Sequence, residues 1–245
     1  MNGLALALAF APLAPWLLRQ GRRVRRDTPR LPPAGGPTCG VAAAAGSSRE
    51  PLRIVAIGES TVAGVGAARH AEALTGQLAA RLAQRSGRAV HWQACGLSGA
   101  TVRQAHLALL PVIAATPADL IVLAFGVNDV LEHTSPRRYA ARLVELIEAV
   151  RARVGPAPVL VSAAPPMARF PSLPKPLATY LGARAALLDG AARRIRLADL
   201  VHVTPTVHVE PAMFAGDGFH PSPAGYAIWA ETLAVAALQR GFTSR

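Results

Sequence analysis

From residue 53 onward, short apolar runs alternate with longer segments in which apolar residues recur every three or four positions. The short runs are typical of buried parallel strands and cover residues 53–57, 90–94, 120–125, 158–163 and 200–203. The longer segments predict helices over residues 72–84, 102–115, 136–154, 179–197 and 224–238. This alternation predicts an α/β domain, a three-layer α/β/α sandwich around a five-stranded parallel sheet in the flavodoxin-like order 2-1-3-4-5.

Helix-starting and helix-breaking residues fall where this pattern needs them. Thr101 is placed to cap one helix, and Pro111 is expected to kink it. Pro136 occupies the first turn of the long helix, and Gly155 follows its end. Residues 165–176 hold five prolines, so this segment is predicted to be neither helix nor central strand.

The N-terminal part of the chain does not follow the alternating pattern. Residues 4–18 are apolar, are interrupted by Pro12 and Pro15, and give way to a basic cluster of Arg19, Arg22, Arg23, Arg25 and Arg26. We therefore interpret residues 1–27 as a membrane-associating segment. Residues 28–50 are rich in Pro, Gly and Ala and are predicted to be a linker, and residues 51–245 to be the domain.

The apolar run is near the lower limit for crossing a bilayer. If it crosses, the positive-inside rule keeps the arginine cluster and the domain in the cytoplasm. If it does not cross, residues 1–26 could lie on the membrane surface with arginines on lipid headgroups. A cleaved secretory signal, with a periplasmic domain, is the alternative, although such signals carry their positive charges before the apolar run.

Composition narrows the possible functions. The chain has 245 residues and a net charge of +12, but Lys175 is the single lysine among 26 basic residues. No basic run interleaved with aromatic residues occurs in the domain, so we do not expect nucleic-acid binding. Cys39 and Cys95 are the two cysteines, which is too few for a disulfide framework or a metal cluster.

Four short motifs carry residues with chemical potential, and each follows a predicted strand or precedes the last helix. They are Gly58-Glu59-Ser60, Gly96, Gly126-Val127-Asn128-Asp129 and Asp217-Gly218-Phe219-His220. Ligands of open α/β sheets bind beyond the carboxyl ends of the strands, where these motifs are expected to meet.

The residue types in these motifs suit acyl transfer. A serine hydroxyl such as that of Ser60 becomes a nucleophile when an adjacent base takes its proton. The Asp217-x-x-His220 spacing allows one loop to supply that base and the carboxylate that orients it. Taken alone, Ser60 could equally be a helix cap, and the Asn128-Asp129 pair could be a turn.

Taken together, the motifs resemble those of the SGNH, or GDSL-type, hydrolase family over residues 54–238. The resemblance implies that Ser60 is the nucleophile, with His220 as base and Asp217 as orienting acid. It also implies an oxyanion hole of Ser60, Gly96 and Asn128, with Gly99 as the rival of Gly96. Supporting roles fall to Gly58, Glu59, Gly126 and Asp129. The family implies no metal and no organic cofactor.

The chain departs from the family at Glu59, where an aspartate is usual, and this change could alter how the loop is held. The expected substrate is a small-molecule or lipid ester, cleaved through an acyl-serine intermediate. The proline-rich segment 165–176 could wall the acyl pocket. Two alternatives stay open: a carbohydrate O-acetylesterase, and a non-catalytic binding module tethered to a membrane. The oligomeric state cannot be read from the sequence.

Overall fold

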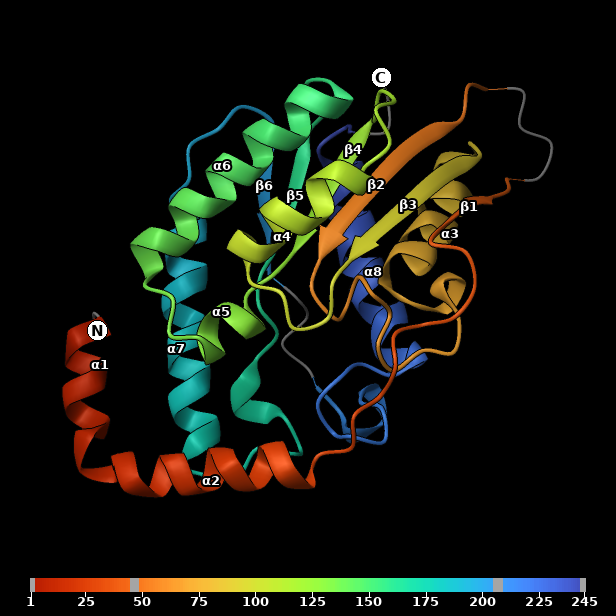
Figure 1. Cartoon of the computed structure of the whole chain (residues 1–245). Helices are drawn as coiled ribbons and strands as arrows, with labels where there is room; N and C mark the ends of the chain where they lie inside the picture. Colours follow the sequence, from red (N-terminus) through yellow and green to blue (C-terminus); the bar gives the residue numbers. More distant parts are fainter. Residues whose placement is uncertain (1–2, 45–48, 205–208, 243–245) are drawn as a thin grey trace.

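The computed structural model describes residues 3–44, 49–204 and 209–242, and its centre is a twisted, mostly parallel sheet (Figure 1). The strands lie in the order β1-β3-β2-β4-β5-β6. Their bounds are β1 Cys39–Ala42, β2 Leu52–Gly58, β3 Val90–Gly96, β4 Leu120–Ala124, β5 Val159–Ser162 and β6 Leu200–Val203. Strands β2 to β6 run parallel to one another and keep the predicted order.

Helices cover both faces of this sheet, as the alternation of strands and helices predicted (Figure 1). Side chains of β4 point alternately to the two faces, so Ile121 and Leu123 belong to one apolar core, and Leu120 and Val122 to the other. The first core is covered by α4 (Val102–Leu109), α5 (Val127–Leu131), α6 (Pro136–Val154) and α7 (Leu177–Ala192). The second is covered by α3 (Leu74–Ser86) and α8 (Pro223–Gln239). The predicted three-layer sandwich is therefore confirmed.

The signals at the helix ends act as predicted. Thr101 caps α4 in a capping box with Gln104. Ser135, which is not among the predicted caps, caps α6 by accepting a hydrogen bond from the Arg138 N–H. The helix predicted over residues 102–115 ends earlier, at Leu109, and continues as a 3-10 turn, Leu110–Val112. Pro111 accounts for the change, because it has no N–H with which to continue the α-helix.

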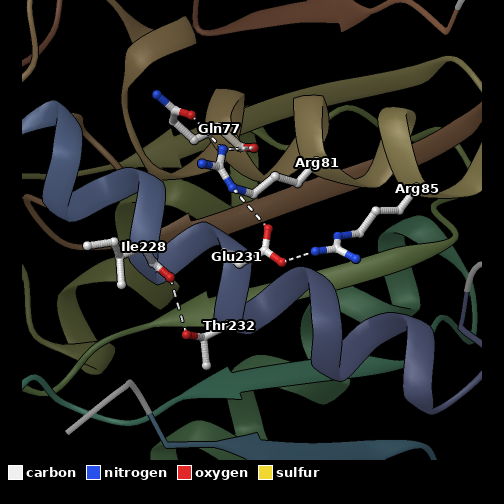
Figure 2. A network of polar contacts seen from close by, with 6 residues as sticks. All are labelled: Gln77, Arg81, Arg85, Ile228, Glu231 and Thr232. Carbon is white, nitrogen blue, oxygen red and sulfur yellow. Dashed lines mark hydrogen bonds and ion pairs between the residues drawn. The ribbon is translucent and has the colours of Figure 1, made fainter. Parts of the chain in front are cut away.

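A surface ion-pair network joins α3 to α8 (Figure 2). The Glu231 carboxylate contacts the guanidinium groups of Arg81 and Arg85, and Arg81 also donates to Gln77. The partners are partly exposed to water, so each pair contributes only about 0–1 kcal/mol to stability. The apolar core that α3 and α8 share, rather than this network, holds the two helices on the sheet.

The prediction that residues 28–50 form a linker is wrong for residues 39–42. This part of the chain forms β1, which runs antiparallel to β3 and completes the sheet as a sixth strand. The Ala34 and Gly35 N–H groups also donate to carbonyls of Ala63 and Ala68, at 3.0 Å each. β1 alternates between exposed and half-buried residues and contains Gly40, so its four residues give little hydrophobic signal.

The first 27 residues form two helices that meet at a bend. α1 (Gly3–Phe10) and α2 (Ala14–Asp27) flank a 3-10 turn, and both pack against α7 (Figure 1). The Phe10 and Tyr180 rings lie 5.3 Å apart, and Leu17 reaches the core. Among the described residues, the stretch Gly3–Asp27 is long and apolar enough to cross a membrane, a property shared by anchors and signal sequences.

Candidate active site

Ser60 lies at the carboxyl end of β2, near the middle of the sheet. β2 ends at Gly58, and the Glu59 N–H donates to the Ala124 carbonyl of β4 at 3.2 Å. The chain then turns sharply, because the Val65 N–H bonds to the Ser60 carbonyl at 2.9 Å. The buried strand and the tight turn together fix the position of the Ser60 hydroxyl.

Asp217 and His220 lie on the loop that precedes α8. The Asp217 Oδ1 accepts hydrogen bonds from the Phe219 and His220 N–H groups at 2.9 Å each, which shapes this loop. The Tyr226 hydroxyl, on the first turns of α8, donates to the Val65 carbonyl at 2.6 Å. This bond ties the helix that follows His220 to the turn that follows Ser60.

The three side chains form one hydrogen-bonded chain. The His220 Nε2 lies 3.1 Å from the Ser60 Oγ, and the His220 Nδ1 lies 2.6 Å from the Asp217 Oδ2. The Asp217 side chain is fully buried, whereas that of His220 is partly exposed. A carboxylate at Nδ1 favours the tautomer that carries its proton there, which leaves Nε2 free to accept the serine proton.

Glu59 is buried beneath Asn128 and acts as an acceptor for the start of α5. Its Oε1 accepts from the Val127 N–H at 3.0 Å. Its Oε2 accepts from the Asn128 N–H at 3.0 Å and from the Asn128 Nδ2 at 2.5 Å. Burial raises the pKa of Glu59 to about 7, and the donors on Asn128 and Val127 oppose the rise by stabilising the carboxylate. The extra methylene of Glu59, relative to the usual aspartate, is thus accommodated by direct contacts with the loop.

The raised pKa of Glu59 predicts a specific dependence of stability on pH. Between pH 4.5 and about 7 the folded protein retains a proton that the unfolded chain releases, so rising pH lowers the free energy of unfolding. The Glu59→Gln variant lacks this titration. Urea unfolding at pH 5 and pH 8 should show the wild type losing stability relative to the variant, by about 1.4 kcal/mol for each pH unit between pH 5 and about 7. An identical pH dependence in the two proteins would contradict this assignment.

Asn128 and Asp129 take different positions on the third motif. The Asn128 Nδ2 donates to Glu59 and also to the Ala100 carbonyl, at 3.3 Å. Asp129 is fully buried, and its Oδ2 accepts the Val102 N–H at 3.0 Å, which joins the motif to the start of α4. Burial raises the pKa of Asp129. Asn128 is therefore half-buried between Glu59 and Ala100, and Asp129 fastens the loop to α4.

The second motif offers two glycines, and the geometry distinguishes between them. The Leu97 N–H donates to the Gly58 carbonyl at 3.1 Å, and adjacent N–H groups of a strand point to opposite edges. The Gly96 N–H therefore points away from β2 and from Ser60. A Cβ on Gly96 would lie 2.0 Å from the Ala63 nitrogen, so close packing against the turn after Ser60 explains this glycine.

Gly99 lies in the loop that contacts Asn128. It has a φ of +83°, which favours glycine, and it directly precedes Ala100, the residue whose carbonyl accepts from the Asn128 amide. Gly99 therefore lies next to the residue that contacts Asn128, whereas the Gly96 N–H points away from β2. The sequence could not decide this point, because it depends on the direction in which one N–H group points.

An apolar cavity of about 90 Å³ lies beside Ser60 and His220. Phe170 and Pro166 of the proline-rich segment form part of its wall, with Met213, Phe214, Phe219, Ile228 and Trp229 among the other lining residues. The Phe170 ring packs edge-on against the rings of Phe214 and Phe219, with distances of 5.4 and 5.1 Å between ring centroids. The first half of the segment 165–176 therefore lines the cavity, and that the cavity is an acyl pocket stays a prediction.

Across the described ranges 3–44, 49–204 and 209–242, no group of three or more His, Cys, Asp or Glu side chains is placed to hold a metal ion. The groups that meet at this edge of the sheet are a serine hydroxyl, an imidazole and a carboxylate. They suit addition of a hydroxyl to a carbonyl group.

Residues 56–228 match the model of the GDSL-like lipase/acylhydrolase family. The chain belongs to this family. GDSL-like esterase Rv1075c of Mycobacterium tuberculosis is 29% identical over 197 residues, which are 76% of this chain and 61% of that protein. The chain thus spans less than two thirds of the length of this GDSL-like relative.

Solved structures share the GDSL-like fold at low sequence identity. Est24, a carbohydrate acetylesterase from Sinorhizobium meliloti, has a TM-score of 0.57 and 24% identity, covering 76% of this chain and 99% of that one. A lipase from a goat rumen metagenome has a TM-score of 0.59 and 17% identity, covering 76% and 97%. These structural similarities show a shared fold and nothing further.

Proposed function

We propose that the protein is a serine ester hydrolase that cleaves carboxylic esters through an acyl-serine intermediate. The observation that carries the proposal is the hydrogen-bonded chain from the Ser60 Oγ through His220 to the buried Asp217, with spans of 3.1 and 2.6 Å. Membership of the GDSL-like family supports the same reaction. A non-catalytic binding module would not need Ser60, His220 and Asp217 to be joined by hydrogen bonds in this way.

In the proposed mechanism, His220 is the general base and then the general acid. Its Nε2 takes the proton of Ser60 as the Oγ attacks the ester carbonyl, and Asp217 stabilises the imidazolium that forms. The tetrahedral intermediate collapses, the C–O bond to the alcohol breaks, and His220 returns its proton to the leaving oxygen. Water, activated by the same His220, then attacks the acyl-serine and releases the acid.

The proposed oxyanion hole consists of the Ser60 N–H, the Gly99 N–H and the Asn128 Nδ2. In the resting site both amide hydrogens of Asn128 have protein acceptors, Glu59 at 2.5 Å and Ala100 at 3.3 Å. The longer bond is the weaker one and is the bond that the oxyanion would replace. Glu59 would keep the amide oriented during this exchange.

Truncation of Asn128 tests the oxyanion assignment. We expect Asn128→Ala to lower kcat by about 10²–10³, as the loss of one oxyanion donor typically does, with a much smaller change in KM. Gln77→Ala on α3 removes an amide remote from the site and should leave kcat unchanged. Steady-state kinetics on a p-nitrophenyl ester measures both, and a normal kcat for Asn128→Ala would exclude it from the hole.

The cavity beside Ser60 favours short acyl chains. Its volume of about 90 Å³ holds a few methylene groups next to Ser60, and its lining is largely apolar and aromatic. Across p-nitrophenyl esters from acetate to dodecanoate, we expect kcat/KM to be highest for the short esters and at least about tenfold lower for dodecanoate. A maximum at dodecanoate would show that long acyl chains bind elsewhere.

The size of the cavity also supports the carbohydrate O-acetylesterase alternative. An acetyl group fits the space, and the sugar would then lie outside it. Strong preference for acetate over hexanoate, with release of acetate from acetylated sugars, would favour this reading. Absence of Ser60-dependent turnover on every ester would instead favour a binding module.

A further inference from the structure

One face of α2 is fixed on the domain. Leu17 is buried in the core and Val24 packs against it. The Gln20 side chain donates to the Lys175 carbonyl at 2.8 Å and accepts from the Leu177 N–H at 3.1 Å. The contacts of Leu17, Gln20 and Val24 fix the rotation of α2 about its own axis. They therefore also determine which side chains lie on its opposite face.

The opposite face of α2 carries an arginine stripe, which we define as Arg19, Arg22, Arg23 and Arg26. Spacings of three and four residues place these side chains on one side of a helix. They line an open surface hollow of about 630 Å³ together with Pro15 and Leu18. The Arg23 and Arg26 side chains are 77% and 75% exposed. Asp27, the single carboxylate of α2, pairs with these two arginines and offsets one charge.

Large apolar side chains are exposed beside the arginine stripe. Trp16 and Leu18 are 55% and 62% exposed, and Leu8 and Leu13 of the adjoining segment are exposed too. Tryptophan is favoured at the boundary between lipid and water, and guanidinium groups bind phosphate through paired hydrogen bonds. A nucleic acid would use the arginines but would gain nothing from the leucines.

We propose that the arginine stripe docks the protein on a bilayer that carries anionic phospholipids, with Trp16 and Leu18 entering the headgroup region. The charge of the stripe complements such a surface, and its apolar flanks distinguish a bilayer from other polyanions.

The same surface adjoins the catalytic loop. A second hollow is lined by Trp16, Arg19 and Arg23 on one side and by Pro171, Ser172 and Asp217 on the other. The Ser172 N–H also donates to the Gly218 carbonyl at 3.1 Å, inside the motif that carries His220. Docking through α2 would therefore bring this loop close to the membrane. That the loop then reaches esters dissolved in the membrane is an inference that rests on the proposed function.

Vesicle flotation of the full chain tests the docking. The wild type should bind vesicles of phosphatidylcholine with phosphatidylglycerol and should not bind pure phosphatidylcholine. Replacing the four arginines of the stripe by Gln should weaken binding at least about tenfold. The matched control replaces four exposed arginines outside α2, Arg137, Arg138, Arg193 and Arg196, and should bind like the wild type.

Tryptophan fluorescence gives an independent measurement. Trp92 and Trp229 are only 8% and 9% exposed, so a blue shift on vesicle binding should report Trp16 and should vanish in Trp16→Phe. Equal binding of the stripe variant, binding lost equally in the control, or displacement of vesicles by equimolar duplex DNA would overturn the proposal. Ser60→Ala should bind vesicles normally, so failure of docking and failure of the esterase assignment give different results.

Discussion

The Ser60→Ala variant is expected to lose ester hydrolysis by about a million-fold in kcat, the loss typical when a serine hydrolase loses its nucleophile. In the wild type, the Ser60 Oγ lies 3.1 Å from the His220 Nε2. Alanine has no hydroxyl that could be acylated. A residual rate of about 10³–10⁴ over water would come from the oxyanion donors and from binding. Steady-state hydrolysis of p-nitrophenyl butyrate by the full chain measures the loss.

Ser86→Ala is the matched control for this experiment. Ser86 lies at the end of α3, remote from the site, and its hydroxyl donates to the Leu82 carbonyl. The control should keep full activity at a small cost in stability. Wild-type activity in Ser60→Ala would refute the proposed nucleophile, and mass spectrometry of the acylated wild type would then locate the residue that reacts.

The Asp217→Asn variant is expected to lower kcat by about 10⁴ with little change in KM. Asparagine keeps the size of the side chain and can still accept the Phe219 and His220 N–H groups that Asp217 Oδ1 accepts at 2.9 Å. Its amide would face the His220 Nδ1 as a donor, however, and would favour the tautomer that cannot take the serine proton.

Asp119→Asn provides the comparison for this second variant. The Asp119 Oδ2 also accepts a backbone N–H, that of Arg53, at 2.7 Å, but it lies at the opposite end of the sheet. The Asp119→Asn variant should leave kcat unchanged. An equal fall in both variants would mean that the loss reflects general destabilisation, and unchanged kcat in Asp217→Asn would remove Asp217 from the mechanism.

The parallel sheet was predictable because each of its central strands is buried on both faces and reads as a short apolar run. β1 was not, because it is an edge strand with half-exposed residues and pairs through its backbone. The five residues of α5 are likewise too few to show a helical period.

The candidate site was predictable to the level of residue type. The motif that carries Ser60 follows a parallel strand, and the motif that carries Asp217 and His220 lies on the late loop before α8. Both were expected at the edge of the sheet where the carboxyl ends of the strands lie. The choice between Gly96 and Gly99 depends on the orientation of one peptide group, and the three hydrogen bonds to Glu59 depend on the packing of α5. Neither property leaves a pattern in the sequence.

The pairing of β1 with β3 affects how the protein should be shortened for experiments. A chain cut at residue 51 would retain every residue of the proposed site yet leave the outer edge of β3 without its partner strand. Bare sheet edges recruit strands from other molecules, so such a fragment is prone to oligomerise or aggregate. Starting the fragment ahead of Cys39 would keep the sheet edge covered while removing both N-terminal helices.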